Sequence, residues 1–225
     1  MRYEIKGGSF PVVICNLENG EKMITEKGSM AWMSPNLQME TKGGGLGKMF
    51  SKAFSGESMF QNHYTARGGA GMIAFTSSFP GEIKVVQIAP GQEMIVQKSA
   101  FLAAEAGVEL SIHFHKKLGA GFFGGEGFIM QKVTGPGMVF LELDGYCKEY
   151  ILGPGERLTC DTGVLAVMDE TCTMDVVMVK GAKNIFFGGE GLLDTVVTGP
   201  GKVCLQTMTI PKLAGLIAPY IVTKN

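Results

Sequence analysis

The sequence FFGGEG at Phe122–Gly127, followed by VTGPG at Val133–Gly137, occurs a second time in this chain. The second copy reads FFGGEG at Phe186–Gly191 and VTGPG at Val197–Gly201. The offset is the same at both ends, from 122 to 186 and from 137 to 201, so no gap is needed between the copies. Repetition at a fixed period indicates a duplicated structural unit. We therefore expect diverged copies of one unit along the chain.

A second pair of segments shows the same offset and extends the repeat. Pro90–Gln92 (PGQ) matches Pro154–Glu156 (PGE). A fainter copy precedes both, in which Gly20 leads to Met30–Trp32 ten residues further on. The chain thus divides into three predicted β repeats and a helical tail: residues 1–78, 79–145, 146–208 and 209–225. A Gly- and Lys-rich insertion, residues 41–57, interrupts the first repeat.

The segments between the turns are short and extended, as Met138–Leu143 illustrates. Short segments of this kind, separated by frequent turn residues, are typical of β-sandwiches and barrels. Helical spacing occurs only near the end, where apolar residues at Leu213, Leu216, Ile217 and Tyr220 recur every three or four positions. The sequence therefore predicts an all-β fold of three diverged repeats forming β-sandwiches, with a short C-terminal helix.

Composition narrows the classes of function. Hydrophobic residues make up 45% of the 225 residues, which allows a packed core. The 20 Lys and Arg nearly balance the 21 Asp and Glu, so the basic surplus of a general nucleic-acid binder is missing. The five cysteines are odd in number and form no CxxC, which favours a reducing compartment and a role as small apolar residues. Because we find no signal-peptide or membrane-spanning pattern, we expect a cytoplasmic protein.

The paired FFGGEG and VTGPG motifs, the PGE turn and the segment Leu213–Tyr220 together resemble the AIM24 family. The resemblance covers essentially the whole chain, because it includes all three repeats and the tail. It implies a fold like that of the tryptophan RNA-binding attenuation protein, a double-stranded β-helix-type sandwich repeated along the chain. Fungal mitochondrial members are implicated in inner-membrane organisation, and the family implies no reaction for bacterial or archaeal members. We expect no mitochondrial transit segment here, so the organelle role is not carried over.

Two glycine-rich segments have the outline of nucleotide-binding loops. Gly119–Gly124 matches GxGxxG, but a β-like segment follows it, whereas a dinucleotide site needs a helix there. Lys42–Lys48 lacks the first glycine of a phosphate loop and is followed by Met49 in place of Ser or Thr. We interpret both as turns or flexible loops, the second with lysines suited to contact an anion. No cofactor is predicted.

His113, His115 and Glu109 are the candidates for a metal site. The histidines are two residues apart in an extended segment, so we expect both on one face, with Glu109 two pleats earlier. A zinc site needs a third and fourth ligand, and the remaining histidine, His63, lies in a different repeat. Two histidines on a solvated strand face or at a subunit interface is the alternative interpretation. We assign no metal and no catalytic residue.

The residues of the repeated motifs are expected to form turns. Glu126 and Glu190 recur with the repeat, so we assign them to hydrogen bonds with nearby backbone amides. The turn residues interpreted as structural are Gly124, Gly125, Glu126, Gly127, Gly135, Pro136, Gly137, Gly188, Gly189, Glu190, Gly191, Gly199, Pro200 and Gly201.

Three classes of function remain. The first is a non-catalytic assembly or scaffold protein that forms a homo-oligomer, with a trimer favoured, and contacts a protein or a membrane surface peripherally. The second is an RNA-binding module by analogy with the attenuation protein, although Arg2, Arg67 and Arg157 are the only arginines. The third is a small-ligand or metal-binding protein of the cupin-like kind, built around the two histidines.

Overall fold

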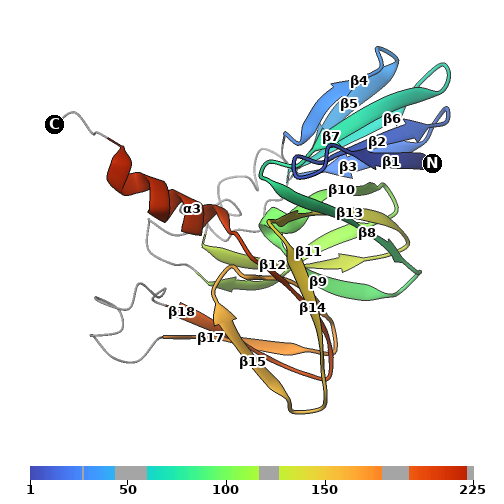
Figure 1. Cartoon of the computed structure of the whole chain (residues 1–225). Helices are drawn as coiled ribbons and strands as arrows, with labels where there is room; N and C mark the ends of the chain where they lie inside the picture. Colours follow the sequence, from blue (N-terminus) through green and yellow to red (C-terminus); the bar gives the residue numbers. More distant parts are fainter. Residues whose placement is uncertain (27, 44–59, 117–126, 179–192, 222–225) are drawn as a thin grey trace.

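The computed structural model describes residues 1–26, 28–43, 60–116, 127–178 and 193–221. Within these ranges the chain is nearly all β-strand, with one α-helix, α3 (Ile210–Ile217), near its end (Figure 1). Two 3-10 turns accompany it, η1 (Lys98–Ala100) and η3 (Ala218–Tyr220). The predictions of an all-β fold and a short C-terminal helix are confirmed. Most of the predicted insertion, residues 44–57, lies outside the described residues.

The strands in the described ranges form four antiparallel sheets. The first has the order β1 (Arg2–Lys6), β2 (Val12–Leu17), β7 (Gly71–Thr76), β4 (Met30–Met33). The second has the order β5 (Leu37–Lys42), β6 (Gln61–Ala66), β3 (Lys22–Thr25), β10 (Phe101–Glu105), β13 (Gly137–Asp144), β8 (Gly81–Ile88). The third has the order β11 (Glu109–Lys116), β12 (Phe128–Thr134), β9 (Glu93–Gln97), β16 (Leu165–Asp169), β19 (Gly201–Gln206), β14 (Cys147–Leu152). The fourth has the order β15 (Arg157–Asp161), β18 (Leu193–Thr198), β17 (Thr173–Met178).

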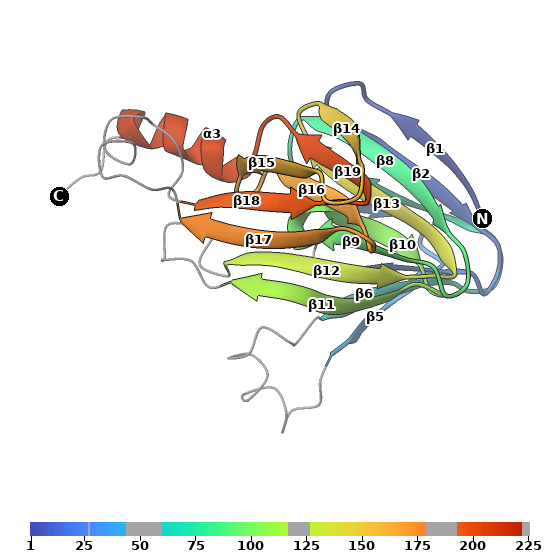
Figure 2. The same ribbon diagram turned by 90° about the horizontal axis from the view of Figure 1, so that it is seen from below.

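The same arrangement of six strands occurs three times, and we name the three sets the first unit (β2–β7), the second unit (β8–β13) and the third unit (β14–β19). In every unit the third, sixth and first strands form one half-sheet, and the fourth, fifth and second strands form another. Strand β1 stands outside this pattern and extends the first half-sheet beside β2. The first sheet and the fourth lie at opposite ends of the molecule (Figure 1). Helix α3 projects from the strands on the side away from the N-terminus (Figure 2).

Half-sheets of neighbouring units join edge to edge. Strand β3 of the first unit pairs with β10 of the second, with Ile24 opposite Ala104. Strand β9 of the second unit pairs with β16 of the third, with Ile95 opposite Met168. Both junctions are antiparallel, and they match residue for residue, because positions 104 and 168 are related by the same offset as the sequence copies. Both contacts between units therefore use equivalent strands in the same register.

A β-bulge recurs at the same place in the third strand of every unit. The register is irregular between Met30 and Trp32 in β4, between Phe101 and Ala103 in β10, and between Leu165 and Val167 in β16. Because a bulge bends a strand and increases its twist, a bulge at equivalent positions gives the three strands the same local shape.

Among the residues that the structure places, three clusters of buried apolar side chains form the core, each centred on one unit. The strand at a junction faces two of them, since successive side chains of a strand point to opposite sides. In β10, Ala103 belongs to the cluster of the first unit, while Ala104 belongs to the cluster of the second. Because β10 contributes side chains to both clusters, it connects the core of the first unit with that of the second.

The Gly-Pro-Gly turns explain why glycine recurs in the sequence motif. A Cβ atom at Gly135 would lie 2.7 Å from the backbone oxygen of Ile88, and one at Gly199 would lie 2.8 Å from that of Leu152. Both distances are shorter than real Cβ contacts, and a backbone oxygen cannot move aside as a side chain can. The first glycine of each turn is therefore required by the close approach of a neighbouring strand.

Candidate functional site

A cavity of about 920 Å³ opens where the ends of several strands meet α3. Its wall combines acidic, amide and apolar side chains, among them Glu142, Asp144, Gln97, Gln206, Phe101 and Ile129. The helix contributes Ile210, Pro211, Ala214 and Gly215. The cavity lining therefore combines hydrogen-bonding groups with apolar surface, which is the usual composition of a small-molecule site.

Glu142 is a buried carboxyl held by the segment that follows β7. The Ser78 amide donates a hydrogen bond to its Oε2 atom at 2.6 Å, and the Ser77 hydroxyl lies 3.1 Å from the same atom. Burial raises the pKa of Glu142, while these hydrogen bonds act in the opposite direction. The carboxyl is thus fixed in position, with its proton affinity increased by its surroundings.

Asp144 follows Glu142 by two residues on β13, so both side chains point to the same face. Asp144 is only 8% exposed. Burial, together with the neighbouring charge of Glu142, raises the pKa of Asp144 to about 7, and the Ile210 backbone amide at the start of α3 opposes this. Asp144 is therefore a group in the cavity lining whose charge changes near neutral pH.

Gln206 stands in the third unit at the position that Glu142 occupies in the second. Its Nε2 atom donates to the backbone oxygen of Gly163 at 2.8 Å. Its Oε1 atom accepts from the backbone amide of Asp144 at 3.0 Å. The amide thus connects the two units at the edge of the cavity. Because it carries no charge, Gln206 places a neutral group where a second glutamate would add to the repulsion between Glu142 and Asp144.

The structure does not assemble the predicted metal candidates into a site. A β-bulge lies at His113, between Ile112 and Phe114, so the alternation that would align His113 with His115 is interrupted. Burial lowers the pKa of His113, and the charge of Lys132 adds to this effect. His113 and Glu109 are exposed at the edge strand β11. Among the residues that the structure describes, no three His, Cys, Asp or Glu side chains are grouped to hold a metal ion.

The predicted turn residues lie in two places. Gly135–Gly137 and Gly199–Gly201 join β12 to β13 and β18 to β19, with cis peptide bonds before Pro136 and Pro200. Gly127 has a φ of 85° immediately before β12. The remaining motif residues, Gly124, Gly125, Glu126, Gly188, Gly189, Glu190 and Gly191, lie outside the described residues.

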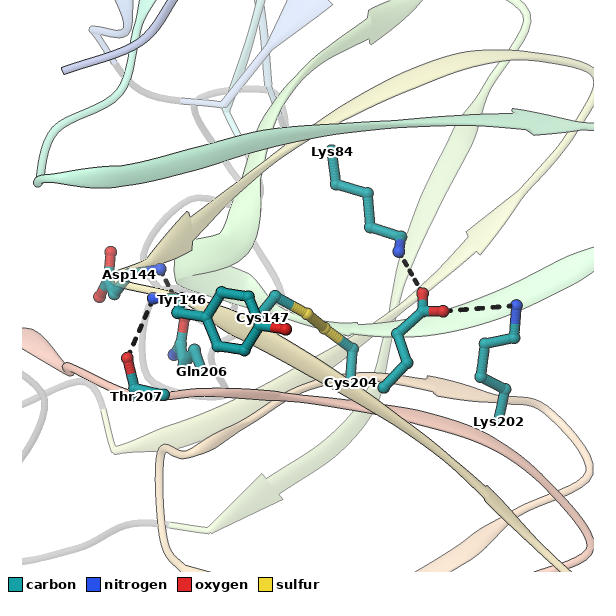
Figure 3. The surroundings of a disulfide bond; sticks show 9 residues. Lys84, Asp144, Tyr146, Cys147, Lys202, Cys204, Gln206 and Thr207 are labelled. Carbon is teal, nitrogen blue, oxygen red and sulfur yellow. Dashed lines mark hydrogen bonds and ion pairs between the residues drawn. A yellow bond between two sulfur atoms is a disulfide. The ribbon is translucent and has the colours of Figure 1, made fainter. Parts of the chain in front are cut away.

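Two of the five cysteines differ from expectation. Figure 3 shows Cys147 joined to Cys204 by a disulfide. The bond links β14 to β19, and the two Cα atoms are 6.2 Å apart. The expectation that all five cysteines are reduced, small apolar residues is therefore wrong for this pair, which sequence spacing could not identify. Glu149, also on β14, pairs with Lys84, and its carboxylate lies 3.8 Å from the Lys202 ammonium. Figure 3 labels both lysines near the disulfide. Strands β14, β19 and β8 are thus tied together at one edge.

Sequence reasoning missed the acidic side of the cavity. The signal was present, because Glu142 and Asp144 interrupt an otherwise apolar strand, Met138–Leu143 and its continuation. A charge inside such a strand marks either a solvated face or a buried functional group. Only the packing of Ser77, Ser78 and α3 against the strand end distinguishes these two possibilities.

A family model described as Mitochondrial biogenesis AIM24 matches residues 3–208, which is most of the chain. The chain belongs to the AIM24 family. The predicted resemblance is confirmed, and all three units of the AIM24 fold fall within the matched range.

The chain is also similar to proteins from Streptococcus pyogenes. An uncharacterized protein of serotype M6, strain ATCC BAA-946 / MGAS10394, is 27% identical over 235 residues, covering 100% of this chain and 93% of that protein. The crystal structure of another protein from this species has a TM-score of 0.80 at 24% identity, covering 98% of this chain and 99% of that chain. Both comparisons show a shared fold and carry no description of an activity. In the described part of this chain, no helix has the length and apolar character needed to cross a bilayer.

Proposed function

We propose that this protein is a non-catalytic assembly protein that forms a homo-oligomer, with a trimer favoured, in the cytoplasm. The observation that carries the proposal is the exposure of large apolar side chains on outer edge strands. Trp32 on β4 is 46% exposed, Ile151 on β14 is 81% exposed and Met178 on β17 is 70% exposed. An edge strand with unpaired backbone groups and exposed apolar side chains is a template for pairing with another chain. Self-association would bury these apolar side chains and pair the edge strands.

The repeated build of the units supports a closed assembly. Homo-oligomers usually have closed rotational symmetry, and a contact between two different surfaces of a chain closes into a ring when its rotation permits. Units that already join edge to edge within the chain have the shape for such a contact. Three chains would place three sets of three equivalent units around one axis.

The test is size-exclusion chromatography with light scattering over a dilution series, with absorbance read at 260 and 280 nm. We expect a single mass of three times the 24.0 kDa of one chain, free of nucleic acid. A monomer at every concentration overturns the proposal. A particle that carries RNA overturns it too, and favours the RNA-binding alternative.

The C-terminal helix is the surface that we assign to contact with a protein partner or, peripherally, with a membrane. No residue of α3 is buried, and Leu216, Ile217 and Tyr220 are 57%, 46% and 84% exposed. An amphipathic helix of this kind can rest on a bilayer surface. Co-sedimentation with anionic phosphatidylserine vesicles, compared between the wild type and a Leu216→Glu/Ile217→Glu variant, tests the membrane alternative. Binding that the variant loses supports it, and absence of binding removes the membrane alternative.

The cavity favours a second candidate function, the binding of a small molecule. Its volume of about 920 Å³ suits a drug-sized ligand, and Glu142 and Asp144 favour a ligand with an ammonium or other donor group. Native mass spectrometry of the freshly purified protein tests this directly. A stoichiometric added mass that Asp144→Asn reduces supports binding, whereas the bare chain mass, together with no thermal shift in a panel of primary amines, removes the candidate.

A further inference from the structure

The first and fourth sheets each end in a strand that lacks the neighbour its equivalents have. Strand β4 is the third strand of the first unit, and its equivalents β10 and β16 each pair with the second strand of the preceding unit. Strand β15 is the second strand of the third unit, and its equivalents β3 and β9 each pair with the third strand of the following unit. Within the described ranges β4 pairs with β7 alone and β15 with β18 alone.

We propose that β15 of one copy of this chain pairs antiparallel with β4 of a second copy, repeating the junctions that already join the units. The four-stranded first sheet of one copy and the three-stranded fourth sheet of the other then form one continuous sheet. This inference rests on the proposed self-association and names its surface. The partner is a second copy of the same chain, since the two internal junctions show which edge each of these strands accepts.

The internal junctions fix the register of the new contact. The residue equivalent to Ile24 and Ile95 in β15 is Thr159, and the residue equivalent to Ala104 and Met168 in β4 is Met33, as the offsets and the shared bulge require. Thr159 of one copy therefore lies opposite Met33 of the other. The neighbouring pairs follow by one residue in each direction.

The hydrogen-bond pattern of the internal junction carries over as well. The Ala106 amide donates to the Lys22 backbone oxygen at 3.3 Å, and hydrogen-bonded pairs recur every second residue in an antiparallel ladder. Ala104 and Ile24 are thus a hydrogen-bonded pair. In the new contact Met33 and Thr159 take this role.

The pairs on either side of Met33 and Thr159 are non-hydrogen-bonded. Trp32 then lies opposite Cys160, with Cα atoms about 4.5 Å apart. Ser34 lies opposite Leu158. The ladder ends there, because Pro35 stands at the position of Ala106 and has no amide hydrogen to donate.

The directions of the side chains agree with this register. Ala103, equivalent to Trp32, belongs to the core cluster of the preceding unit, whereas Met33 packs against the cluster of its own unit. Trp32 therefore points away from its own core, toward the place where a preceding unit would lie, and it is 46% exposed. In the partner copy that place is the third unit, where Leu158 and Cys160 pack against the local cluster. The contact buries Trp32 over apolar side chains.

Charge does not oppose the contact. Strand β4 carries no charged residue, and β15 carries Arg157 and Asp161 only at its ends. Like charges directly opposite one another would have destabilised the pair. Because β4 and β15 lie at opposite ends of the molecule, the contact joins two different chains and continues from head to tail until a ring closes (Figure 1).

Cysteine cross-linking tests the register. In a Trp32→Cys variant the new thiol lies opposite the native Cys160 of the next copy, at a Cα separation that a disulfide spans. We expect copper phenanthroline at alkaline pH to give interchain-linked species on a non-reducing gel, reversed by dithiothreitol. Mass spectrometry is expected to find a disulfide between the peptides that carry positions 32 and 160. Alkaline conditions are needed because burial raises the pKa of Cys160 to about 12.

Two matched controls separate this contact from random collisions. The Trp32→Cys/Cys160→Ser variant has no opposite thiol and is expected to remain uncross-linked. The second control is Met39→Cys. The wild-type Met39 side chain is 54% exposed, close to the 46% of Trp32, and β5 lies at the edge of another sheet. This variant too is expected to give no link. Links of equal yield in either control overturn the register.

A charge-pair exchange keeps the inference falsifiable if oxidation is inefficient. Met33→Glu and Thr159→Lys each place a lone charge in the contact, and the double variant pairs the two charges across it. We expect each single variant to raise the dissociation constant of the oligomer at least tenfold and the double variant to recover most of the loss. An oligomer unaffected by all three variants overturns this contact but leaves self-association standing, whereas a monomeric wild type overturns both.

Discussion

The backbone amide of Asp144 donates a hydrogen bond to the side-chain oxygen of Gln206, 3.0 Å away, and so joins the end of the second unit to the end of the third. The carboxyl of the same aspartate lies in the cavity beside Glu142. One residue thus contributes its backbone to the connection between units and its side chain to the cavity. A substitution at position 144 therefore removes the carboxyl from the cavity and keeps the backbone hydrogen bond to Gln206.

Asp144→Asn is expected to stabilise the protein at alkaline pH. The folded state holds the Asp144 proton up to a pKa of about 7, whereas the unfolded chain releases it near the ordinary aspartate pKa of 3.8. Wild-type stability therefore falls as the pH rises between these values, and it is unaffected below them. Asparagine removes this loss, so we expect a gain of roughly 2 kcal/mol at pH 8 and none at pH 3.5. Urea unfolding at both pH values measures the difference.

Glu142→Ala is expected to destabilise the protein more than Glu142→Gln. The alanine leaves the Ser78 amide without its acceptor, at a cost of about 1–3 kcal/mol, whereas glutamine keeps an oxygen in reach. Comparing the two variants in urea removes the effect of the lost charge, since both lack it. Equal stability of the two variants would show that the Ser78 hydrogen bond contributes nothing.

Gly135→Ala is expected to cost at least about 2 kcal/mol, because its Cβ atom would lie 2.7 Å from the Ile88 oxygen in the neighbouring strand end. Gly28→Ala is the control, since a Cβ atom there meets nothing within 4 Å. Thermal unfolding of both variants checks the prediction. Backbone entropy alone makes Gly→Ala neutral or stabilising, so no loss is expected at Gly28, and an equal loss at both positions would contradict the close approach as the cause.

A thiol count in denaturant checks the disulfide between Cys147 and Cys204. We expect three reactive thiols in the protein as purified, from Cys15, Cys160 and Cys172, and five after reduction. Cys204→Ser is expected to lower the free energy of unfolding by about 2–4 kcal/mol. Five thiols without reductant would contradict the bond. The same thiol count on protein alkylated inside living cells tests the location. Five alkylated thiols indicate a reducing cytoplasm, where Cys147 and Cys204 stay reduced, and three indicate an oxidising compartment.

The fold was predictable because the copies of the unit are long and the turns between them are marked by glycine and proline, as at Gly135–Gly137. The joining of half-sheets was not, because β3 and β10 are far apart in the sequence and short strands carry no mark of their partner. The same limit applies to the cavity, which collects residues from all three units and α3. The expectation that His113 and His115 share one face was wrong for a local reason, since a bulge at His113 interrupts the alternation of the strand.

Trp32 is the single tryptophan of the chain, and it lies on the outer edge of β4. Its indole emission therefore reports from one known place without any label. In a separated chain the ring is in contact with water, and emission at long wavelength and ready quenching by iodide follow. In a ring of chains the indole is covered by the neighbouring chain, so its emission shifts to shorter wavelength and iodide quenches it less. The fluorescence spectrum therefore measures the fraction of β4 edges that are unpaired.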